Sequence, residues 1–232
     1  MSVLVIIPAY NEQESIEKVV DNLKKNYPQY DYIIINDGSK DKTSAICHER
    51  GYEIIDLPVN LGLTGAFQTG LKYAYKKGYD YAIQFDADGQ HLPEYIEPMV
   101  DKINEGYDLV IGSRFVEKKK PKTLRMLGSA MISFAIKVTT GKYVADPTSG
   151  MRLFNKSLIK EFAENINYEP EPDTVSFLIK QGVKVAEVQV EMKERETGES
   201  YLNLSRSVVY MTKMFISIIV LQNFRNRKRG GK

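Results

Sequence analysis

Apolar runs alternate with helical patterns along the first half of the chain. Four continuous apolar runs and one shorter run predict strands over residues 3–7, 32–35, 81–85, 109–113 and 53–57. Between them, apolar side chains recur at helical spacing. This pattern predicts four helices: one that begins at residue 16, one that begins at residue 43, one that ends near residue 78 and one over residues 92–105. Strands that alternate with helices predict an α/β fold with a mostly parallel, Rossmann-like sheet flanked by helices. Because the strands are apolar at successive positions, we expect both faces of the sheet to be buried.

The second half of the chain is less regular. Residues 117–125 contain four lysines, Pro121 and Arg125, which predicts an exposed basic loop. Residues 146–152 predict a turn, residues 183–193 alternate as a strand does, and helical patterns cover 127–137, 157–164, 173–181 and 204–226. We therefore divide the chain into an α/β domain, residues 1–203, and a C-terminal apolar helix with a basic tail, residues 204–232.

The composition fits a folded protein and narrows its chemistry. The chain has 232 residues, of which 43% are hydrophobic and 27% are charged, enough for a sizeable core. Cys47 is the only cysteine, which excludes an intrachain disulfide and a cysteine-based zinc site. The net charge is +2, yet the last eight residues alone carry five positive charges. Such a tail predicts an anionic partner, and because it is short and lacks interleaved aromatics, we expect a membrane surface and no nucleic acid.

The apolar run at the N-terminus does not resemble a signal peptide, because no basic segment precedes it and it stops at Pro8. No stretch reaches the ~20 apolar residues that a membrane-spanning helix needs. The nearest, residues 208–224, is interrupted by Lys213. We expect a cytoplasmic protein that binds the cytoplasmic membrane face peripherally.

Polar motifs follow four of the predicted strands, at residues 8–12, 37–39, 86–90 and 112–114. Asp, Asn and Gly are also ordinary turn residues, so one such motif would carry little weight. In open α/β sheets, however, ligands bind outside the carboxyl ends of the strands. Four polar motifs at one edge of the sheet therefore predict a binding site there.

Asp86 and Asp88 are the most informative pair in these motifs. At the end of a strand, one carboxylate can point toward a bound ribose and the other toward a metal. Mg²⁺ and Mn²⁺ take oxygen ligands from one or two carboxylates together with substrate phosphates, and Gln90 adds a neutral oxygen close by. The motif predicts a site where a nucleoside diphosphate leaving group is neutralised. His91 lies next to this loop and is a weak candidate ligand.

With these motifs in place, the chain resembles glycosyltransferase family 2, and within it the polyprenyl-phosphate sugar transferases of the dolichyl-phosphate mannosyltransferase type. The matching segments are Pro-Ala-Tyr-Asn-Glu at 8–12, Asn-Asp-Gly-Ser-Lys-Asp-Lys-Thr at 36–43, Asn-Leu-Gly-Leu-Thr-Gly at 60–65 with Gly70, Asp-Ala-Asp-Gly-Gln at 86–90, Gly-Ser-Arg at 112–114, Asp-Pro-Thr-Ser-Gly-Met-Arg at 146–152, and Arg195 with Gly-Glu-Ser at 198–200. The resemblance implies the GT-A fold. It also implies an inverting, metal-dependent transfer of a sugar from a UDP- or GDP-linked donor to polyprenyl phosphate.

The resemblance also implies roles for individual residues. The nucleoside would be held by Pro8, Ala9, Tyr10, Glu12, Asp37, Asp86 and Ala87. Asp88 and Gln90 would hold Mg²⁺ or Mn²⁺ against the diphosphate. Arg114 and Arg152 would bind donor or acceptor phosphate, which suits the planar fork of a guanidinium. Arg125, Arg195 and Ser200 would contact the acceptor.

Three readings of Asp146 remain open. A sugar hydroxyl acceptor, on a growing cell-surface glycan, needs a general base, and Asp146 would be that base. A phosphate monoester has a second pKa of ~6 and needs no strong base, so Asp146 would then only orient the acceptor or Arg152. A turn-capping aspartate before Pro147 is the plain structural alternative. A sugar-nucleotide-binding protein without catalysis is a third possibility for the whole chain.

The chain also departs from parts of the family. It has no tryptophan, which disfavours the processive synthases with their Gln-x-x-Arg-Trp motif, and it shows no C-terminal membrane-spanning helices. In their place stand the apolar helix and the basic tail. That helix is either part of the core or a contact with the membrane or with a small membrane protein that supplies the missing helices.

Overall fold

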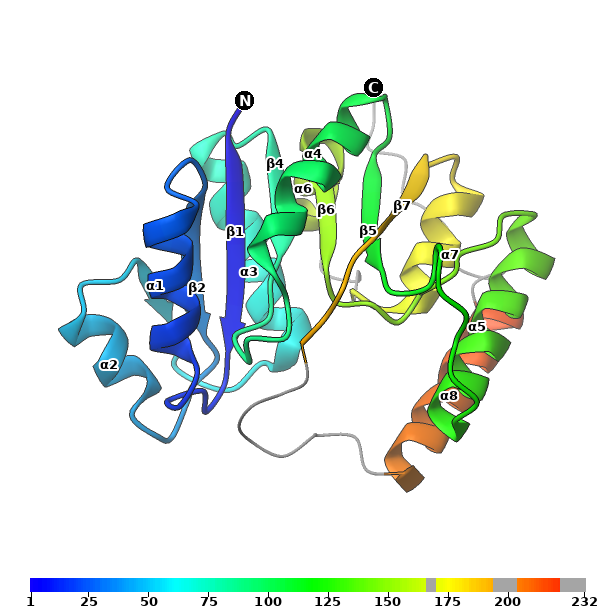
Figure 1. Cartoon of the computed structure of the whole chain (residues 1–232), viewed down its shortest axis with the longest axis horizontal. Helices are drawn as coiled ribbons and strands as arrows, with labels where there is room; N and C mark the ends of the chain where they lie inside the picture. The colour runs from blue at the N-terminus through cyan, green and yellow to red at the C-terminus, as the bar shows by residue number, and fades with distance from the viewer. Residues whose placement is uncertain (166–169, 194–203, 222–232) are drawn as a thin grey trace.

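The computed structural model describes residues 1–165, 170–193 and 204–221 (Figure 1). Within these residues the strands form one seven-stranded sheet in the order β3-β2-β1-β4-β6-β5-β7. The strands are β1 (Val3–Ala9), β2 (Asp31–Asn36), β3 (Ile54–Asp56), β4 (Tyr81–Gln84), β5 (Leu109–Ser113), β6 (Arg152–Asn155) and β7 (Val185–Gln189). All six strands that the sequence predicts are present. The expected α/β fold with a mostly parallel sheet is confirmed.

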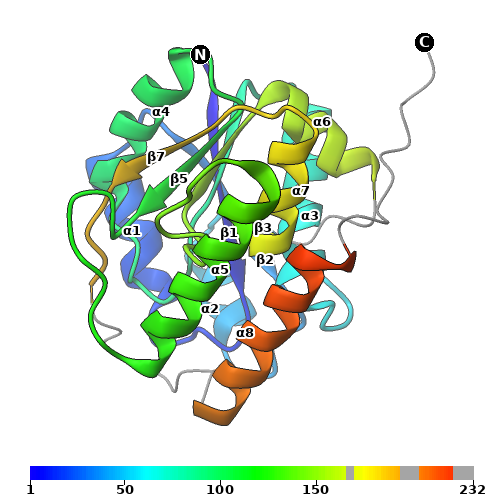
Figure 2. The ribbon, with the colours of Figure 1, turned by 90° about the vertical axis from the view of Figure 1, so that its right-hand side faces the viewer.

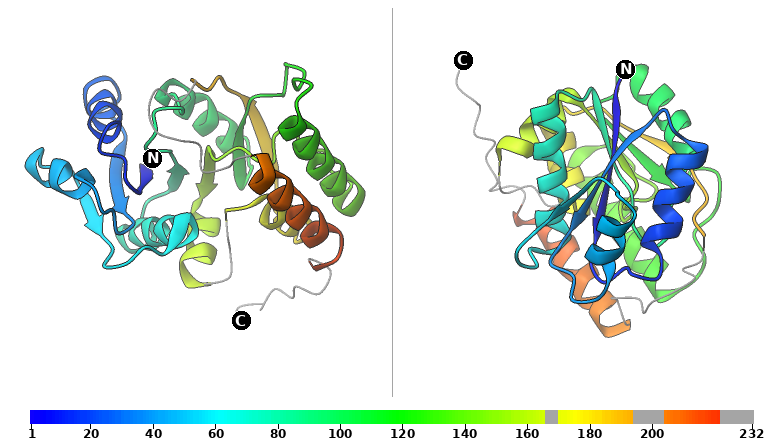
Figure 3. Two further views of the ribbon diagram at one scale, coloured as in Figure 1. Left: turned by 90° about the horizontal axis from the view of Figure 1, so that it is seen from below. Right: turned by 90° about the vertical axis from the view of Figure 1, so that its left-hand side faces the viewer.

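Helices cover both faces of the sheet, as Figure 3 shows from below. Buried side chains of α1 (Ile16–Asn26), α2 (Thr43–Glu49) and α4 (Ile96–Asn104), which follows a short 3₁₀ turn (Pro93–Tyr95), pack on one face. Those of α3 (Gly62–Lys77), α5 (Leu124–Thr140), α6 (Lys156–Glu164), α7 (Pro172–Lys180) and α8 (Leu204–Ile219) pack on the other. Alternate residues of β1 contribute to the two cores: Leu4 and Ile6 to one, Val5 and Ile7 to the other. This explains why β1 is apolar at successive positions.

Strand β6 is the element that the sequence did not predict. It is antiparallel to both β4 and β5, whereas the other paired strands are parallel. Its four residues have an arginine and an asparagine at their ends, so only Leu153 and Phe154 carry an apolar signal, too short to identify a strand. Because β6 runs the opposite way, its first residue, Arg152, lies beside Gln84 and Ile111. The start of β6 therefore adjoins the carboxyl ends of β4 and β5.

The C-terminal helix α8 lies alongside α5 and α7 (Figure 2). Met214 and Ile218 on its inner side belong to the same buried cluster as α5 and α7. Gly128 on α5 allows the close approach, because a Cβ added there would lie 2.6 Å from Cγ of Met211. No helix among the described residues is long and apolar enough to cross a membrane.

Candidate active site

The loops after β1 and β2 are joined to each other at the carboxyl edge of the sheet. The Asn11 amide donates to Oγ of Ser39 at 3.0 Å, and the Lys40 amide donates to Oδ1 of Asn11 at 2.8 Å. Asn11 has a positive φ of 57°, a conformation that asparagine tolerates better than most residues. These bonds hold the segment that contains Pro8, Ala9 and Tyr10 against the loop that follows β2, and the Tyr10 side chain is exposed.

Asp37 is buried and held by backbone groups. Its amide donates to the carbonyl of Ala9 at 2.8 Å, and its Oδ1 accepts from the Leu61 amide at 2.7 Å. Gly38 follows in a left-handed conformation, and a Cβ there would lie 2.8 Å from the Asn60 amide nitrogen. Asp37 therefore has a fixed position between the ends of β1 and β2 and the start of α3.

Glu12 shapes the beginning of α1. Its carboxylate accepts from Oγ of Ser15 at 2.8 Å, its amide donates to Oγ1 of Thr43 at 2.8 Å, and its carbonyl accepts from the Ile16 amide at 2.9 Å. Sequence reasoning placed Glu12 at the nucleoside. Its contacts show that it also fixes the loop that presents Tyr10.

The loop after β4 carries Asp86, Ala87, Asp88 and Gln90. Oδ1 of Asp88 accepts from the Gln90 amide at 3.0 Å, and the Gln90 carbonyl accepts from the Lys193 amide at 3.0 Å. No group of three or more His, Cys, Asp or Glu side chains within the described residues could hold a metal. Mg²⁺ can bind through one or two carboxylates and keep its remaining positions for phosphates and water, and the metal contact expected for Asp88 and Gln90 stays a prediction.

His91 is buried beneath this loop, and sequence reasoning underestimated it. Its Nδ1 accepts from the Asp86 amide at 2.9 Å, and its Nε2 lies 3.4 Å from Oδ2 of Asp86. A Cβ added at Gly150 would lie 3.2 Å from the same Oδ2, so the 146–152 turn closes over the carboxylate. The observed contacts of His91 position Asp86. A cavity of about 380 Å³ on the α1 side of the loop is lined in part by His91 and Asp88.

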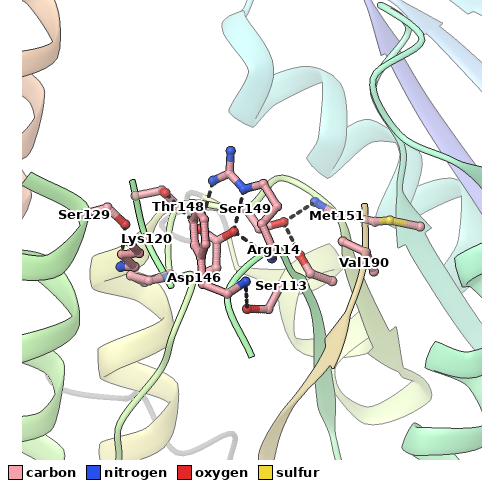
Figure 4. Close-up of polar contacts among 12 residues, drawn as sticks. Ser113, Arg114, Lys120, Ser129, Asp146, Thr148, Ser149, Met151 and Val190 are labelled. Carbon is pink, nitrogen blue, oxygen red and sulfur yellow. Dashed lines mark hydrogen bonds and ion pairs between the residues drawn. The ribbon is translucent and has the colours of Figure 1, made fainter. Parts of the chain in front are cut away.

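Arg114 and Asp146 form a paired unit at the end of β5 (Figure 4). Nε and Nη2 of Arg114 donate to the two carboxylate oxygens of Asp146 at 2.7 and 2.9 Å, and the Arg114 amide adds a third bond at 3.1 Å. Asp146 is 0% exposed. The expected partner of Asp146 was Arg152 or the acceptor, and the structure shows Arg114 instead. With both of its oxygens engaged in this way, Asp146 is poorly placed to take a proton from a substrate.

Glu187 on β7 binds the backbone of the turn that carries Asp146. Its two carboxylate oxygens accept from the amides of Ala145 and Asp146 at 2.7 and 2.8 Å. Ser149 ties the same turn to β5 through a bond from its Oγ to the Gly112 carbonyl at 2.5 Å. Sequence reasoning missed Glu187, because in the alternating pattern of β7 it appears as one of the outward-facing charges.

Arg152 is buried rather than part of a surface ion pair. Its Nε donates to the Ser149 carbonyl and its Nη2 to the Pro147 carbonyl, both at 2.9 Å. Burial lowers the pKa of its guanidinium, and the carboxylates of Glu171 and Asp173 act in the opposite direction. The observed contacts of Arg152 hold the 146–152 turn in shape, and its phosphate contact stays a prediction.

Lys120 departs from the expected exposed basic loop. It is half-buried, and its Nζ donates to Oγ of Ser129 at 2.9 Å and to Oγ of Ser133 at 3.1 Å, both on the inner side of α5 (Figure 4). Burial lowers the pKa of its ammonium, and the nearby charges of Asp146 and Glu187 raise it. A second cation is thus held next to the Arg114–Asp146 pair. The two serines, four residues apart on the buried side of α5, were the signal in the sequence.

The acceptor contacts expected for Arg125, Arg195 and Ser200 stay predictions. Arg125 is exposed in the first turn of α5. Arg195 and Ser200 lie outside the described residues.

Comparison with known proteins identifies the family. The model of glycosyl transferase family 2 matches residues 4–162, well over half of the chain. The chain belongs to glycosyl transferase family 2. This glycosyltransferase is 35% identical over 212 residues to the UDP-N-acetylglucosamine–dolichyl-phosphate N-acetylglucosaminyltransferase of Methanococcus voltae, with 81% of the chain and 84% of the relative covered. It is 30% identical over 229 residues to the undecaprenyl-phosphate mannosyltransferase of Micrococcus luteus, with 92% and 93% covered.

A solved structure confirms the expected GT-A-like fold of this glycosyltransferase. Glucosyl-3-phosphoglycerate synthase from Mycobacterium tuberculosis, in complex with Mn²⁺, UDP-glucose and phosphoglyceric acid, matches with a TM-score of 0.70 at 18% identity. The match covers 98% of this chain and 81% of the synthase. At this identity the likeness concerns the fold alone.

Proposed function

We propose that this glycosyltransferase moves a sugar from a nucleoside diphosphate sugar to polyprenyl phosphate, with inversion, at the cytoplasmic face of the membrane. The observation that carries the proposal is the unit formed by Arg114, Asp146 and Lys120. It presents two cations next to a carboxylate that is already fully engaged, which suits an anionic acceptor and not a hydroxyl that needs a base. The names of the relatives, which state dolichyl and undecaprenyl phosphate, support the same acceptor class.

The donor would lie along the carboxyl edge between the loops after β1, β2 and β4. Asp37, which the Leu61 amide holds in place, would accept from a base N–H, and Asp86, which His91 holds in place, would contact the ribose region. The other predicted nucleoside residues, Pro8, Ala9, Tyr10, Glu12 and Ala87, line the same loops. A rigid set of this kind binds the donor with little loss of loop entropy.

Asp88 and Gln90 would hold Mg²⁺ or Mn²⁺, which when bound neutralises charge on the diphosphate leaving group. Arg114 would add a planar donor to the phosphate oxygens. A phosphate monoester acceptor is ionised near neutrality, with a second pKa of ~6, so Asp146 would orient Arg114 and not remove a proton. Residues 204–232 would contribute a contact to the membrane or to a small membrane protein.

A donor and acceptor panel tests the proposal. The purified protein is incubated with Mg²⁺ or Mn²⁺, UDP- and GDP-sugars and undecaprenyl phosphate, and lipid-linked sugar and released nucleoside diphosphate are both measured. We expect a lipid-linked product from one donor, and its loss when EDTA is added. Nucleotide release that requires a glycan hydroxyl acceptor, with no lipid-linked product, would contradict the proposed acceptor.

His91 provides a finer test of the donor site. His91→Leu removes the acceptor of the Asp86 amide and should raise the donor KM about tenfold, with a smaller effect on kcat, because Asp86 loses its orientation. His91→Asn places an amide oxygen where Nδ1 accepts, and it should restore most of the donor affinity. Equal donor KM values for the two variants and the parent would show that His91 serves only the packing of Phe85.

A further inference from the structure

Helix α5 leaves an apolar stripe exposed along its whole length. Leu124, Leu127, Met131, Phe134 and Val138 recur at intervals of three and four residues, and Phe134 and Val138 are each 62% exposed. The stripe is about 21 Å long at 1.5 Å per residue. Scattered exposed apolar residues are normal, but a regular stripe on one side of a helix marks an interaction surface.

The charged residues within α5 and α8 all have one sign. Neither α5 nor α8 contains an aspartate or a glutamate. Lys119 and Lys122 are exposed just before α5, Arg125 is exposed in its first turn, and Lys137 in its last. An apolar stripe on a helix whose own charged residues are all cations is the pattern of a helix that lies in the interface of an anionic membrane.

Helix α8, which lies next to α5, also exposes apolar and cationic side chains. On α8, Val209 and Ile216 are exposed at 69% and 50%, Lys213 is exposed between them, and the inner residues Met214 and Ile218 are buried in the core. Both helices begin at the lower edge of the molecule in Figure 1, and β1 and β5 run toward that side in the same view. Lys120 links this surface to the site, because it bonds to Ser129 and Ser133 on the inner side of α5.

We propose that the exposed stripe of α5, with α8 beside it, inserts into the headgroup region of an anionic lipid bilayer. The inference deepens the proposed function, because it names the surface that would bring Arg114 and Lys120 to a membrane-bound acceptor phosphate. Lys119, Lys122 and Arg125 contact the lipid headgroups, and the apolar side chains of α5 enter the boundary with the acyl chains.

Because the chain has no tryptophan, a single one reports insertion directly. Phe134→Trp places the reporter on the stripe, and Tyr75→Trp places it at an exposed aromatic position on α3 as a matched control. The full chain is mixed with vesicles of phosphatidylcholine alone or with phosphatidylglycerol added. We expect the emission of the Phe134→Trp variant to shift to the blue with anionic vesicles and to be quenched by lipids brominated on their acyl chains, while the control is unaffected.

A second pair of variants tests the surface by affinity. Leu127→Glu in the parent should weaken binding to anionic vesicles about tenfold, and Lys119→Gln with Lys122→Gln should do the same. Tyr75→Glu, which adds the same charge elsewhere, should leave binding unchanged. An unshifted emission from the Phe134→Trp variant, or vesicle binding that ignores all stripe variants, would overturn the proposal and direct the search to a protein partner. Neither readout needs donor or acceptor, so vesicle binding without sugar transfer would contradict only the proposed function.

Discussion

Replacing Asp88 with asparagine is expected to lower sugar transfer about a thousandfold or more, the largest effect of any single change in this chain. The side chain keeps its shape but loses the charge that would hold Mg²⁺ or Mn²⁺ against the diphosphate. The Asp88 carboxylate lies in a loop and is only half-buried, so the melting temperature should change little. Initial rates at several Mn²⁺ concentrations, together with a thermal melt, provide the measurement.

Asp101→Asn is the matched control for Asp88→Asn. Asp101 is exposed on α4, away from the carboxyl edge, and its replacement removes the same charge. The control should retain the parental rate and the parental dependence on metal. Retention of more than a tenth of the rate by Asp88→Asn would remove Asp88 from the metal site.

The second large effect concerns Arg114 and Asp146, and a double-mutant cycle separates their roles. Arg114→Ala should lower kcat/KM for the acceptor about a hundredfold or more, because a preorganised cation is lost. Asp146→Asn should lower it about ten- to a hundredfold, because Arg114 loses its orientation. If Asp146 acts through Arg114, the double variant should match Arg114→Ala alone.

Independent, multiplying losses in that cycle would instead assign Asp146 a base role, and abolition of turnover by Asp146→Asn alone would point the same way. Glu191→Gln is the control. It removes a carboxylate from an exposed ion pair with Lys118, and such exposed pairs contribute little to stability because solvent screens them. Asp146→Asn should lower the free energy of unfolding by about 1–3 kcal/mol, because the Asp146 side chain is completely buried.

Much of the fold was predictable from local patterns. The strand at residues 3–7 was predicted from a continuous apolar run, and the helix from Ile16 was predicted from apolar residues at helical spacing. Strand β6 was not predictable in this way. Its identity depends on pairing with β4 and β5, and Arg152 pairs with Gln84, which lies far away in the sequence. Local patterns contain no information on such pairing.

In the candidate site, too, some features could be predicted from the sequence and others could not. Asp37, Asp86 and Asp88 follow strands directly, so their common edge could be inferred from the topology alone. The partner of Asp146 could not, because Arg114 is 32 residues away and reaches it only when β5 and the 146–152 turn meet. The functions of Lys120 and Glu187 likewise depend on contacts between α5, β7 and that turn. In an amphipathic sequence pattern, a charged residue that is buried at a site cannot be distinguished from one that is exposed to solvent. Only the fold shows which of them are buried.

The antiparallel β6 also bears on how the chain assembles as it leaves the ribosome. Strands β1 to β4 come from residues 3–84 and can pair among themselves early, since their contacts lie within the first part of the chain. The β4 edge then stays unpaired until Arg152–Asn155 has been synthesised. An unpaired edge of this kind is a template for wrong partners. The synthesis of β6 therefore covers the β4 edge and removes this template for aggregation.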